Sequence, residues 1–229
     1  MTTLSKNAHR SRDAHWSKDA RWLKDARQKR SRATEKALAV AARDLLSEKS
    51  YEEIRVGDVA RAAGTSVGGF YARYSGKNAL LHLADIDFLD ECVLAFDRAV
   101  PPDFGGTLEE LLRSFVRVMV LQFDRHRDTL VQALKHASED DKSDFRRRAT
   151  AFNNHVHGRL RTIMSIHTHR MVHQNAGVAI NMAIFMASAA AREAVLRGAL
   201  AAYPITLTLE ELTDELAAGA LAYLTGGGR

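Results

Sequence analysis

One stretch of this chain, residues 56–81, constrains the fold more than any other. It reads VGDVARAAGTSVGGFYARYSGKNALL, and Val59 and Ala63 recur within it at the spacing of a short helix with one apolar face. Gly64 can adopt the positive φ that ends such a helix, and Ser66 stands where a second helix would take its N-cap. The stretch therefore predicts two short helices joined by a tight turn. This is the helix-turn-helix, whose second helix enters the major groove of DNA.

The second of these helices should have an inward and an outward face. Phe70 and Tyr74 stand four residues apart and are expected to point into a small core, whereas Tyr71 and Arg73 fall on other faces. A longer helix is expected to open after the motif, at Lys77. The stretch would then present a short helix held by aromatic residues, with polar side chains left to face outward.

The segment resembles the DNA-binding motif of the TetR family of bacterial transcriptional regulators. The residues that carry this resemblance are Tyr51, Val56, Asp58, Val59, Ala60, Ala63, Gly64, Ser66, Gly68, Phe70, Tyr71, Tyr74, Lys77, Ala79, Leu80 and Leu81. The resemblance runs from about Thr34 to Leu81. Two positions depart from it: Arg55 replaces the usual Ser or Thr cap, and Gly69 replaces the usual Thr or larger residue.

The resemblance implies that the motif and the residues just before it contact DNA. The expected contact residues are Arg30, Arg32, Arg55, Thr65, Ser66, Val67, Gly68, Gly69, Tyr71, Arg73 and Lys77. Arg73 is the candidate for reading bases, because arginine can bond both O6 and N7 of guanine; a phosphate contact is its alternative. Lys77 and Tyr71 are expected to bind phosphate, and Gly69 to let the backbone approach DNA closely. Arg55 is either a phosphate contact or a surface charge.

The positive charge of the chain is concentrated near its N-terminus. The net charge is +5, yet residues 1–32 contain ten Lys and Arg against three Asp, so the rest of the chain is slightly acidic. We expect residues 1–30 to form a basic arm. It contains a six-residue repeat, DAHWSK, DARWLK and DARQKR, whose period places Trp16 and Trp22 on different helical faces. The arm is therefore either a solvated tail or a further contact to DNA, and a membrane-surface helix is disfavoured.

Composition favours a compact all-helical protein. Hydrophobic residues make up 46% of the 229 residues, only three prolines occur, and no strand pattern of any length is present. The single cysteine, Cys92, permits no intrachain disulfide and fits a reducing, cytoplasmic location. The N-terminus lacks the apolar core of a secretory signal, and the longest apolar run, residues 176–191, is too short to span a bilayer comfortably.

The apolar stripes divide the chain into a small and a large helical domain. We expect a helix-turn-helix domain over residues 31–76, a helical ligand-binding and dimerisation domain over residues 77–225, and a flexible tail over residues 226–229. The helices within them are expected over residues 34–47, 77–100, 128–136, 142–166 and 172–200. Two further helices should begin at the capping boxes Thr107-x-x-Glu110 and Thr208-x-x-Glu211.

The helix expected over residues 172–200 is apolar nearly all the way round in its middle. A helix of this kind in a soluble protein has to be covered on both sides. One side can face the domain core, and the other is expected to meet a second copy of the chain, with Ala187, Ala189, Ala190 and Ala191 allowing close approach. The last two helices are therefore the predicted homodimer interface, a helix pair similar to the dimerisation bundle of the TetR family.

The resemblance also implies that the larger domain binds a small-molecule effector. The candidate wall residues, for which ordinary core packing is the alternative, are Phe88, Cys92, Phe96, Phe115, Met119, Phe123 and Phe152. Their character indicates an apolar or aromatic effector. Cys92 lies on an apolar helix face, so a buried structural thiol is the first interpretation of it.

Neither an enzyme nor a cofactor is expected. The chain contains no GxSxG, P-loop, HExxH or strand-associated GxGxxG signature. His169 and His173 stand four residues apart, a spacing that could chelate a metal on a helix. No third ligand is evident in the sequence, so we predict surface or pocket histidines and no metal site.

Together these features predict a homodimeric, ligand-responsive transcriptional regulator that represses from a palindromic operator. By the resemblance, two reading helices would enter successive major grooves whose centres lie about 34–36 Å apart. A small molecule that favours another conformation would release the DNA. Three alternatives stay open at the level of sequence: an activator with the same DNA-binding apparatus, a metal-sensing regulator, and a helical enzyme or binding bundle whose helix-turn-helix is incidental.

Overall fold

The structure is a computed structural model that describes residues 30–136 and 142–226. For residues 142–146 it describes the backbone alone. No strand occurs among the described residues, so the prediction of an all-α fold is confirmed. The helices are residues 30–48, α2 (Val56–Ala62), α3 (Val67–Tyr71), α4 (Ala79–Ala99), α5 (Leu108–Arg125), α6 (Arg127–His136), α7 (Lys142–Met164), α8 (Ala176–Arg197) and α9 (Leu209–Thr225). The predicted basic arm and most of the predicted tail lie outside the described residues.

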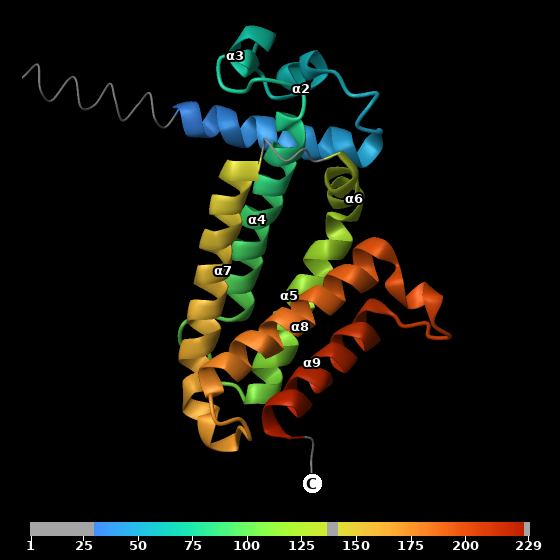
Figure 1. Cartoon of the computed structure of the whole chain (residues 1–229). Helices are drawn as coiled ribbons and strands as arrows, with labels where there is room; N and C mark the ends of the chain where they lie inside the picture. Colours follow the sequence, from blue (N-terminus) through green and yellow to red (C-terminus); the bar gives the residue numbers. More distant parts are fainter. Residues whose placement is uncertain (1–29, 137–141, 227–229) are drawn as a thin grey trace, which may run out of the picture.

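The helices form two parts (Figure 1). The small part, at one end of the molecule, consists of the helix of residues 30–48, α2, α3 and the first turns of α4. The larger part consists of the rest of α4 and the helices that follow it. The helix of residues 30–48 crosses this end, and α2 and α3 lie on its outer side. α4 begins in the small part and runs into the larger part beside α7, against which it packs. α5, α8 and α9 pack against one another. The helix-turn-helix therefore lies at an extremity of the molecule, where a second molecule can reach it.

The local sequence explains where several helices begin and end. Both predicted capping boxes form: Thr107 Oγ1 accepts from the backbone N–H of Glu110 at 3.2 Å, and Thr208 Oγ1 does the same for Glu211 at 3.2 Å. In each box the glutamate side chain accepts from the backbone N–H of the threonine, so two donors that lack intrahelical partners are satisfied. α8 ends at Gly198, whose φ of +60° a glycine adopts without strain.

Several helix boundaries differ from the prediction. The first helix begins at residue 30 and not at Thr34. α4 begins at Ala79, because Lys77 still belongs to a turn. α7 ends at Met164 and is followed by a short 3-10 helix, η1 (Ser165–Arg170).

The bounds of α8 differ as well, because it begins at Ala176 and not at Val172, and it ends at Arg197 and not at Leu200. The side chain of Asn175 accepts from the backbone N–H of Val178 at 3.1 Å, so Asn175 caps the helix. Val172 donates its backbone N–H to the carbonyl of Leu224 at 3.0 Å, which fastens the preceding loop to α9.

The small part has a hydrophobic core of its own. Its fully buried members include Leu38, Ala42, Leu46, Val59 and Phe70, together with Leu80, Leu81, Leu83 and Ala84 of α4 and the buried Ala133 of α6. The first turns of α4 thus share a core with the helix-turn-helix. A displacement of α4 or α6 would therefore be transmitted to α3 by direct packing.

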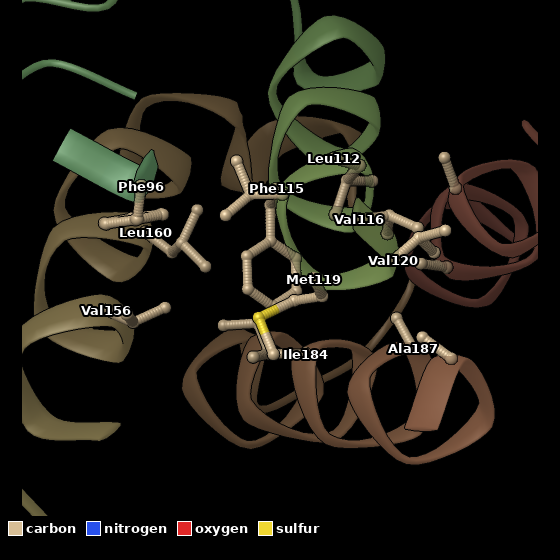
Figure 2. Close-up of a cluster of buried hydrophobic side chains, with 14 of the residues drawn as sticks. Phe96, Leu112, Phe115, Val116, Met119, Val120, Val156, Leu160, Ile184 and Ala187 are labelled. Carbon is tan, nitrogen blue, oxygen red and sulfur yellow. The ribbon is translucent and has the colours of Figure 1, made fainter. Parts of the chain in front are cut away.

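The larger part is built around α5. Figure 2 shows Phe115 and Met119 of α5 among side chains from α4, α7 and α8, which include Phe96, Val156, Leu160, Ile184 and Ala187. Val116 and Val120 of α5 lie on the side toward α9. This core holds α4, α7 and α8 around α5.

Arg43, in the helix of residues 30–48, joins the two parts through carboxylates of α4. Its Nη1 donates to Asp87 Oδ2 at 2.5 Å and to Glu91 Oε1 at 2.6 Å. Nε2 of the buried His126, at the end of α5, lies 3.0 Å from Glu91 Oε2. Burial raises the pKa of Asp87, while the Arg43 guanidinium acts in the opposite direction. The four side chains form one polar network between the small and the larger part.

Gln132 of α6 makes a second polar connection to the small part. Its Oε1 accepts from the backbone N–H of Tyr51 at 2.5 Å, and its Nε2 donates to the carbonyls of Leu46 at 2.6 Å and Lys49 at 3.0 Å. These carbonyls lie at the C-terminal end of the helix of residues 30–48, where backbone acceptors lack intrahelical partners. Gln132 therefore ties α6 to the loop that precedes α2.

Candidate DNA-binding surface and ligand cavity

The turn between α2 and α3 is built as the sequence predicts. Gly64 has a φ of +65°, and the N–H of Thr65 bonds to the carbonyl of Ala60 at 2.9 Å, which closes the end of α2. Ser66 Oγ accepts from the backbone N–H of Gly69 at 2.9 Å, so Ser66 is the N-cap of α3. These contacts set the angle between the two helices from local sequence alone.

α3 is a short helix held by one buried aromatic side chain. Phe70 is fully buried, and its ring lies 5.2 Å from that of Tyr74 and 5.4 Å from that of Tyr71. Val67 and Tyr71 are exposed, at 45% and 52% of their surface. The outer face of α3 thus presents the apolar side chain of Val67 and the phenol of Tyr71 to the surroundings.

Arg73 and Tyr74 lie beyond the end of α3, although the sequence predicts them on the helix. α3 ends at Tyr71, and the backbone N–H groups of both later residues turn back to the carbonyl of Phe70. Arg73 Nη1 donates to the carbonyl of Gly69 at 2.9 Å. The guanidinium therefore lies over the C-terminal end of α3 and is exposed there.

Lys77 is half-buried in the turn before α4. Its Nζ donates to the carbonyl of Glu52 at 3.1 Å and lies 4.4 Å from the centre of the Tyr51 ring. Tyr51 is itself fixed, because its hydroxyl donates to Asn78 Oδ1 at 2.6 Å. The lysine that the sequence assigns to phosphate thus has an aromatic support and a defined position.

The other predicted contact residues surround α3. Arg30 and Arg32 are exposed at the start of the helix of residues 30–48. Arg55 occupies the N-cap position of α2 but makes no capping hydrogen bond with its side chain, which is exposed. The structure therefore leaves these three guanidinium groups at the surface of the small part.

Gly68 and Gly69 differ in the space around them. A Cβ at Gly69 would lie 2.7 Å from Thr65 Oγ1 and 3.3 Å from Ser66 Oγ, whereas one at Gly68 would meet only Ser66 Oγ at 3.8 Å. The side chains of Thr65 and Ser66 thus leave little room for a Cβ at position 69, and this explains the glycine there without any contact to DNA. Gly68 has no such requirement, and its backbone is exposed.

The larger part encloses a cavity of about 750 Å³ between α4, α5, α6, α7 and α8. Among the predicted wall residues, those that line it are Phe88, Phe115, Met119, Phe123 and Phe152. Cys92 and Phe96 do not. They lie farther along α4, fully buried, where the Phe96 ring packs against Phe115 with their centres 6.4 Å apart. Burial raises the pKa of the Cys92 thiol, as expected for a structural cysteine.

The cavity also has polar lining residues that the sequence analysis missed. They are His82 and Asp85 of α4, Thr150, Asn153 and His157 of α7, and Ser188 and Arg192 of α8. Asp85 is buried, and that burial raises the pKa of its carboxyl to about 7. The sequence carries a signal for this residue, because Asp85 lies four residues from both Leu81 and Leu89 on an otherwise apolar stripe.

His169 and His173 do not share a helix, contrary to the geometry that their spacing suggests. His169 lies in η1, whereas His173 lies in the loop before α8, with Nε2 2.6 Å from the carbonyl of Tyr223. Within the part of the chain that the structure describes, no group of three or more His, Cys, Asp or Glu side chains could hold a metal ion.

α8 has one buried and one exposed apolar face. Ile180, Ala187 and Ala191 are buried within the chain, whereas the exposed face carries Val178, Met182, Phe185 and Met186. Among the four alanines of the predicted close approach, Ala190 is exposed and Ala189 lines the cavity. By length and composition alone, α8 could also cross a membrane, a test that core helices pass as well.

Comparison with known proteins supports the assignment of the small part and of the fold. Residues 38–84 match the family described as bacterial regulatory proteins, tetR family. A tetR-family transcriptional regulator from Streptomyces coelicolor is similar in structure, with a TM-score of 0.59 and 21% identity over 83% of this chain and 79% of that one. The fatty acid degradation regulator FadR from Bacillus halodurans has a TM-score of 0.58 and 15% identity over 82% of this chain and 94% of that one.

A third similar structure is that of NalD from Pseudomonas aeruginosa, the secondary repressor of a multidrug efflux pump. Its TM-score is 0.56, with 18% identity over 85% of this chain and 98% of that one. Among proteins with curated descriptions, none is similar enough in sequence to count as a relative. At these levels of identity the structural likenesses establish the fold of the part of the chain that they cover, and the match over residues 38–84 concerns its small part.

Proposed function

We propose that this chain, whose residues 38–84 match the TetR family of bacterial regulatory proteins, is a transcriptional repressor that binds a palindromic operator as a homodimer. The observation that carries this proposal is the capped, outward-facing α3. Ser66 and Gly64 fix its position, Phe70 anchors it, and Val67 and Tyr71 are exposed on it. A helix presented in this way at the end of a molecule fits the major groove.

We assign roles to the residues of this surface from their positions. Arg73, beyond the end of α3, is the candidate for a base contact and would leave the Gly69 carbonyl to make it. Lys77 and Tyr71 bind phosphate, as do Arg30, Arg32 and Arg55. Thr65, Ser66, Val67, Gly68 and Gly69 form the N-terminal end of α3 that approaches the bases. The DNA-binding domain in this proposal spans residues 31–76, and the ligand-binding and dimerisation domain spans residues 77–225.

The exposed apolar face of α8 supports a homodimer. Four large apolar side chains on one helix face form a surface that a second copy of the chain would cover. α9 packs beside α8 and exposes Ala218, Gly219 and Ala222, which would allow its backbone to approach a partner helix closely. A dimer through α8 and α9 would set the separation of its two α3 helices.

Regulation in this proposal comes from a small molecule in the cavity between α4 and α8. α6 lines that cavity with Leu130 and Leu134 and holds the small part through Gln132. An occupant that shifts α6 or α4 would change the positions of the two α3 helices, and it would release DNA to the extent of its differential affinity for the two states. The printed descriptions of NalD as a repressor and of FadR as a regulator fit this direction of control.

The test is a salt series of binding between the full chain and the DNA upstream of its own gene. We expect tight, sequence-selective binding at physiological salt. Arg73→Ala should weaken it about tenfold and relax selectivity at one base pair. Arg98→Ala is the matched control, because Arg98 is exposed on α4 in the larger part. Binding that is weak at every sequence and vanishes with added salt would count against the proposal, because it would reflect only attraction between a basic chain and a polyanion.

A further inference from the structure

The cavity is apolar over most of its wall and contains five phenylalanines from four helices. Phe88 comes from α4, Phe115 and Phe123 from α5, Phe152 from α7 and Phe185 from α8. Its volume of about 750 Å³ falls within the range of small-molecule sites, roughly 300–1,000 Å³. The few polar groups on such a wall select and orient the ligand.

Asp85 is the only carboxylate among the described residues that line this cavity. Asp85 is 9% exposed as a whole residue, and none of the described residues donates a hydrogen bond to its side chain or pairs with it. A carboxylate buried without a partner is costly, and proteins rarely keep one unless it has a function. Asp85 therefore points to a ligand that supplies the missing donor.

The other titratable groups of the cavity leave this position open. His82 lies one turn earlier on α4. His157 of α7 lies with Nδ1 3.4 Å from Asn181 Oδ1, and Arg192 of α8 is half exposed and pairs with Glu193 at 3.5 Å. The lining residues from α5 and α6 are all apolar. No cation of the described chain therefore neutralises Asp85.

We propose that the cavity binds an organic cation: an aromatic or aliphatic body with one protonated amine, whose N–H donates to the Asp85 carboxylate. An ionised carboxylate only accepts, and its hydrogen bond from an ammonium group is charge-assisted and among the strongest in proteins. The phenylalanine rings cover the apolar body and attract the positive charge through their faces. An anionic head group would face a like charge. This inference rests on the proposed function only where it makes the cation the effector that releases DNA.

The test uses ligands that share one body and differ in the head group. The probes are 1-naphthylmethylamine, 1-naphthalenemethanol and 1-naphthoate, and, as a longer set, decylamine, decanol and decanoate. Their affinities for the full chain are measured by calorimetry without DNA. We expect the amine of at least one set to bind ten times more tightly than its alcohol and its acid, or better. Equal affinities within both sets, or preference for the acid, would overturn the proposal.

Two variants assign the preference to Asp85. Asp85→Asn keeps the shape and removes the charge, so it should bind the amine and the alcohol about equally. Asp90→Asn, on the exposed side of the same helix, should keep the wild-type preference. Amine affinity of the wild type should also rise between about pH 6 and pH 8 as Asp85 ionises, while alcohol affinity stays constant. An Asp85→Asn variant that still prefers the amine would place the cation elsewhere and refute the assignment.

Adding the amine to a complex of the chain with operator DNA separates the two proposals. Release of DNA by the amine in the wild type, and its loss in Asp85→Asn, supports both. Amine binding through Asp85 in a chain that fails to bind operator supports the ligand class and counts against the repressor. A chain that binds operator but shows no amine preference supports the repressor and rejects the ligand class.

Discussion

Asp85 and Asp87 lie two residues apart on α4 and are almost equally buried, yet only Asp87 has partners. Asp87 faces the helix of residues 30–48, where Arg43 donates to it at 2.5 Å, and Glu91 extends the contact to His126. Asp85 faces the cavity, and burial is the one cause that raises the pKa of its carboxyl, with no neighbouring charge lowering it. The two faces of one helix thus treat the same side chain in opposite ways.

The difference shows how the molecule separates holding its parts together from receiving a ligand. Removing a carboxylate from water is costly, and at Asp87 the guanidinium and its hydrogen bonds offset part of that cost. At Asp85 nothing in the described chain offsets it. The unpartnered Asp85 therefore lowers the free energy of unfolding of the whole protein, a cost that is common where a site is shaped for a ligand.

The largest effect is expected from Asp85→Asn, which should stabilise the unliganded protein. The rise in pKa from 3.8 to about 7 means that the ionised folded state loses on the order of 4 kcal/mol relative to the unfolded state. This cost is absent below about pH 4 and complete above about pH 7, because the folded pKa is the higher of the two. Urea unfolding should show Asp85→Asn to be more stable than wild type at pH 8, with an advantage less than half as large at pH 5.

A constant difference between Asp85→Asn and wild type across that range would mean that the carboxyl does not titrate as a buried, unpartnered group. A variant less stable than wild type at pH 8 would mean that Asp85 has a favourable partner. Either result would remove the contrast between the two faces of α4.

The next largest effect is expected from Arg43→Ala on the opposite face. It leaves Asp87 and Glu91 close together without their cation, so we expect a loss of about 3 kcal/mol in the free energy of unfolding. Arg61→Ala is the matched control: Arg61 is 82% exposed and lies 3.4 Å from Asp58, and its removal should cost less than about 0.5 kcal/mol. If the two variants were equally stable in urea, the Arg43 network would contribute no more than a surface pair.

The sequence predicted those features that local hydrogen bonds decide. Gly64, Ser66 and the two capping boxes act within four residues of themselves, and all of them appear in the structure as expected. The end of α3 was predicted too late, because the apolar spacing of Phe70 and Tyr74 continues past the last helical residue, Tyr71. Burial of Tyr74 against Phe70 needs only a turn there, and helix ends commonly tighten in this way.

The cavity and the connections between the two parts could not be predicted in the same way. Arg43 meets Asp87 and Glu91 across more than forty residues of chain, and periodicity does not indicate which charges will face each other. Phe115 and Phe96 have the same character in sequence, yet only Phe115 reaches the cavity. Asp85 was detectable as a charge on an apolar stripe, but whether it has a partner depends on which helices pack over it.

The smallest effect is expected from Gln132→Ala, and it tests whether the polar connections between the parts matter for DNA as well as for stability. The variant leaves one donor and two acceptors of the small part without their partner, so a loss of about 1–2 kcal/mol is expected in urea. Because the loop before α2 is then held less firmly, operator affinity should fall by several-fold as well. Lys135→Ala, exposed on the same helix, should change neither quantity.

A Gln132→Ala variant that loses stability but binds operator as wild type would mean that α6 supports the small part without influencing α3. The contact that couples the cavity to DNA would then have to be α4, whose first turns share the core of the small part and whose Asp85 faces the ligand. In the opposite case, with affinity reduced more than stability, α6 is the element that connects them. This follows because Leu130 and Leu134 line the cavity two residues to either side of Gln132.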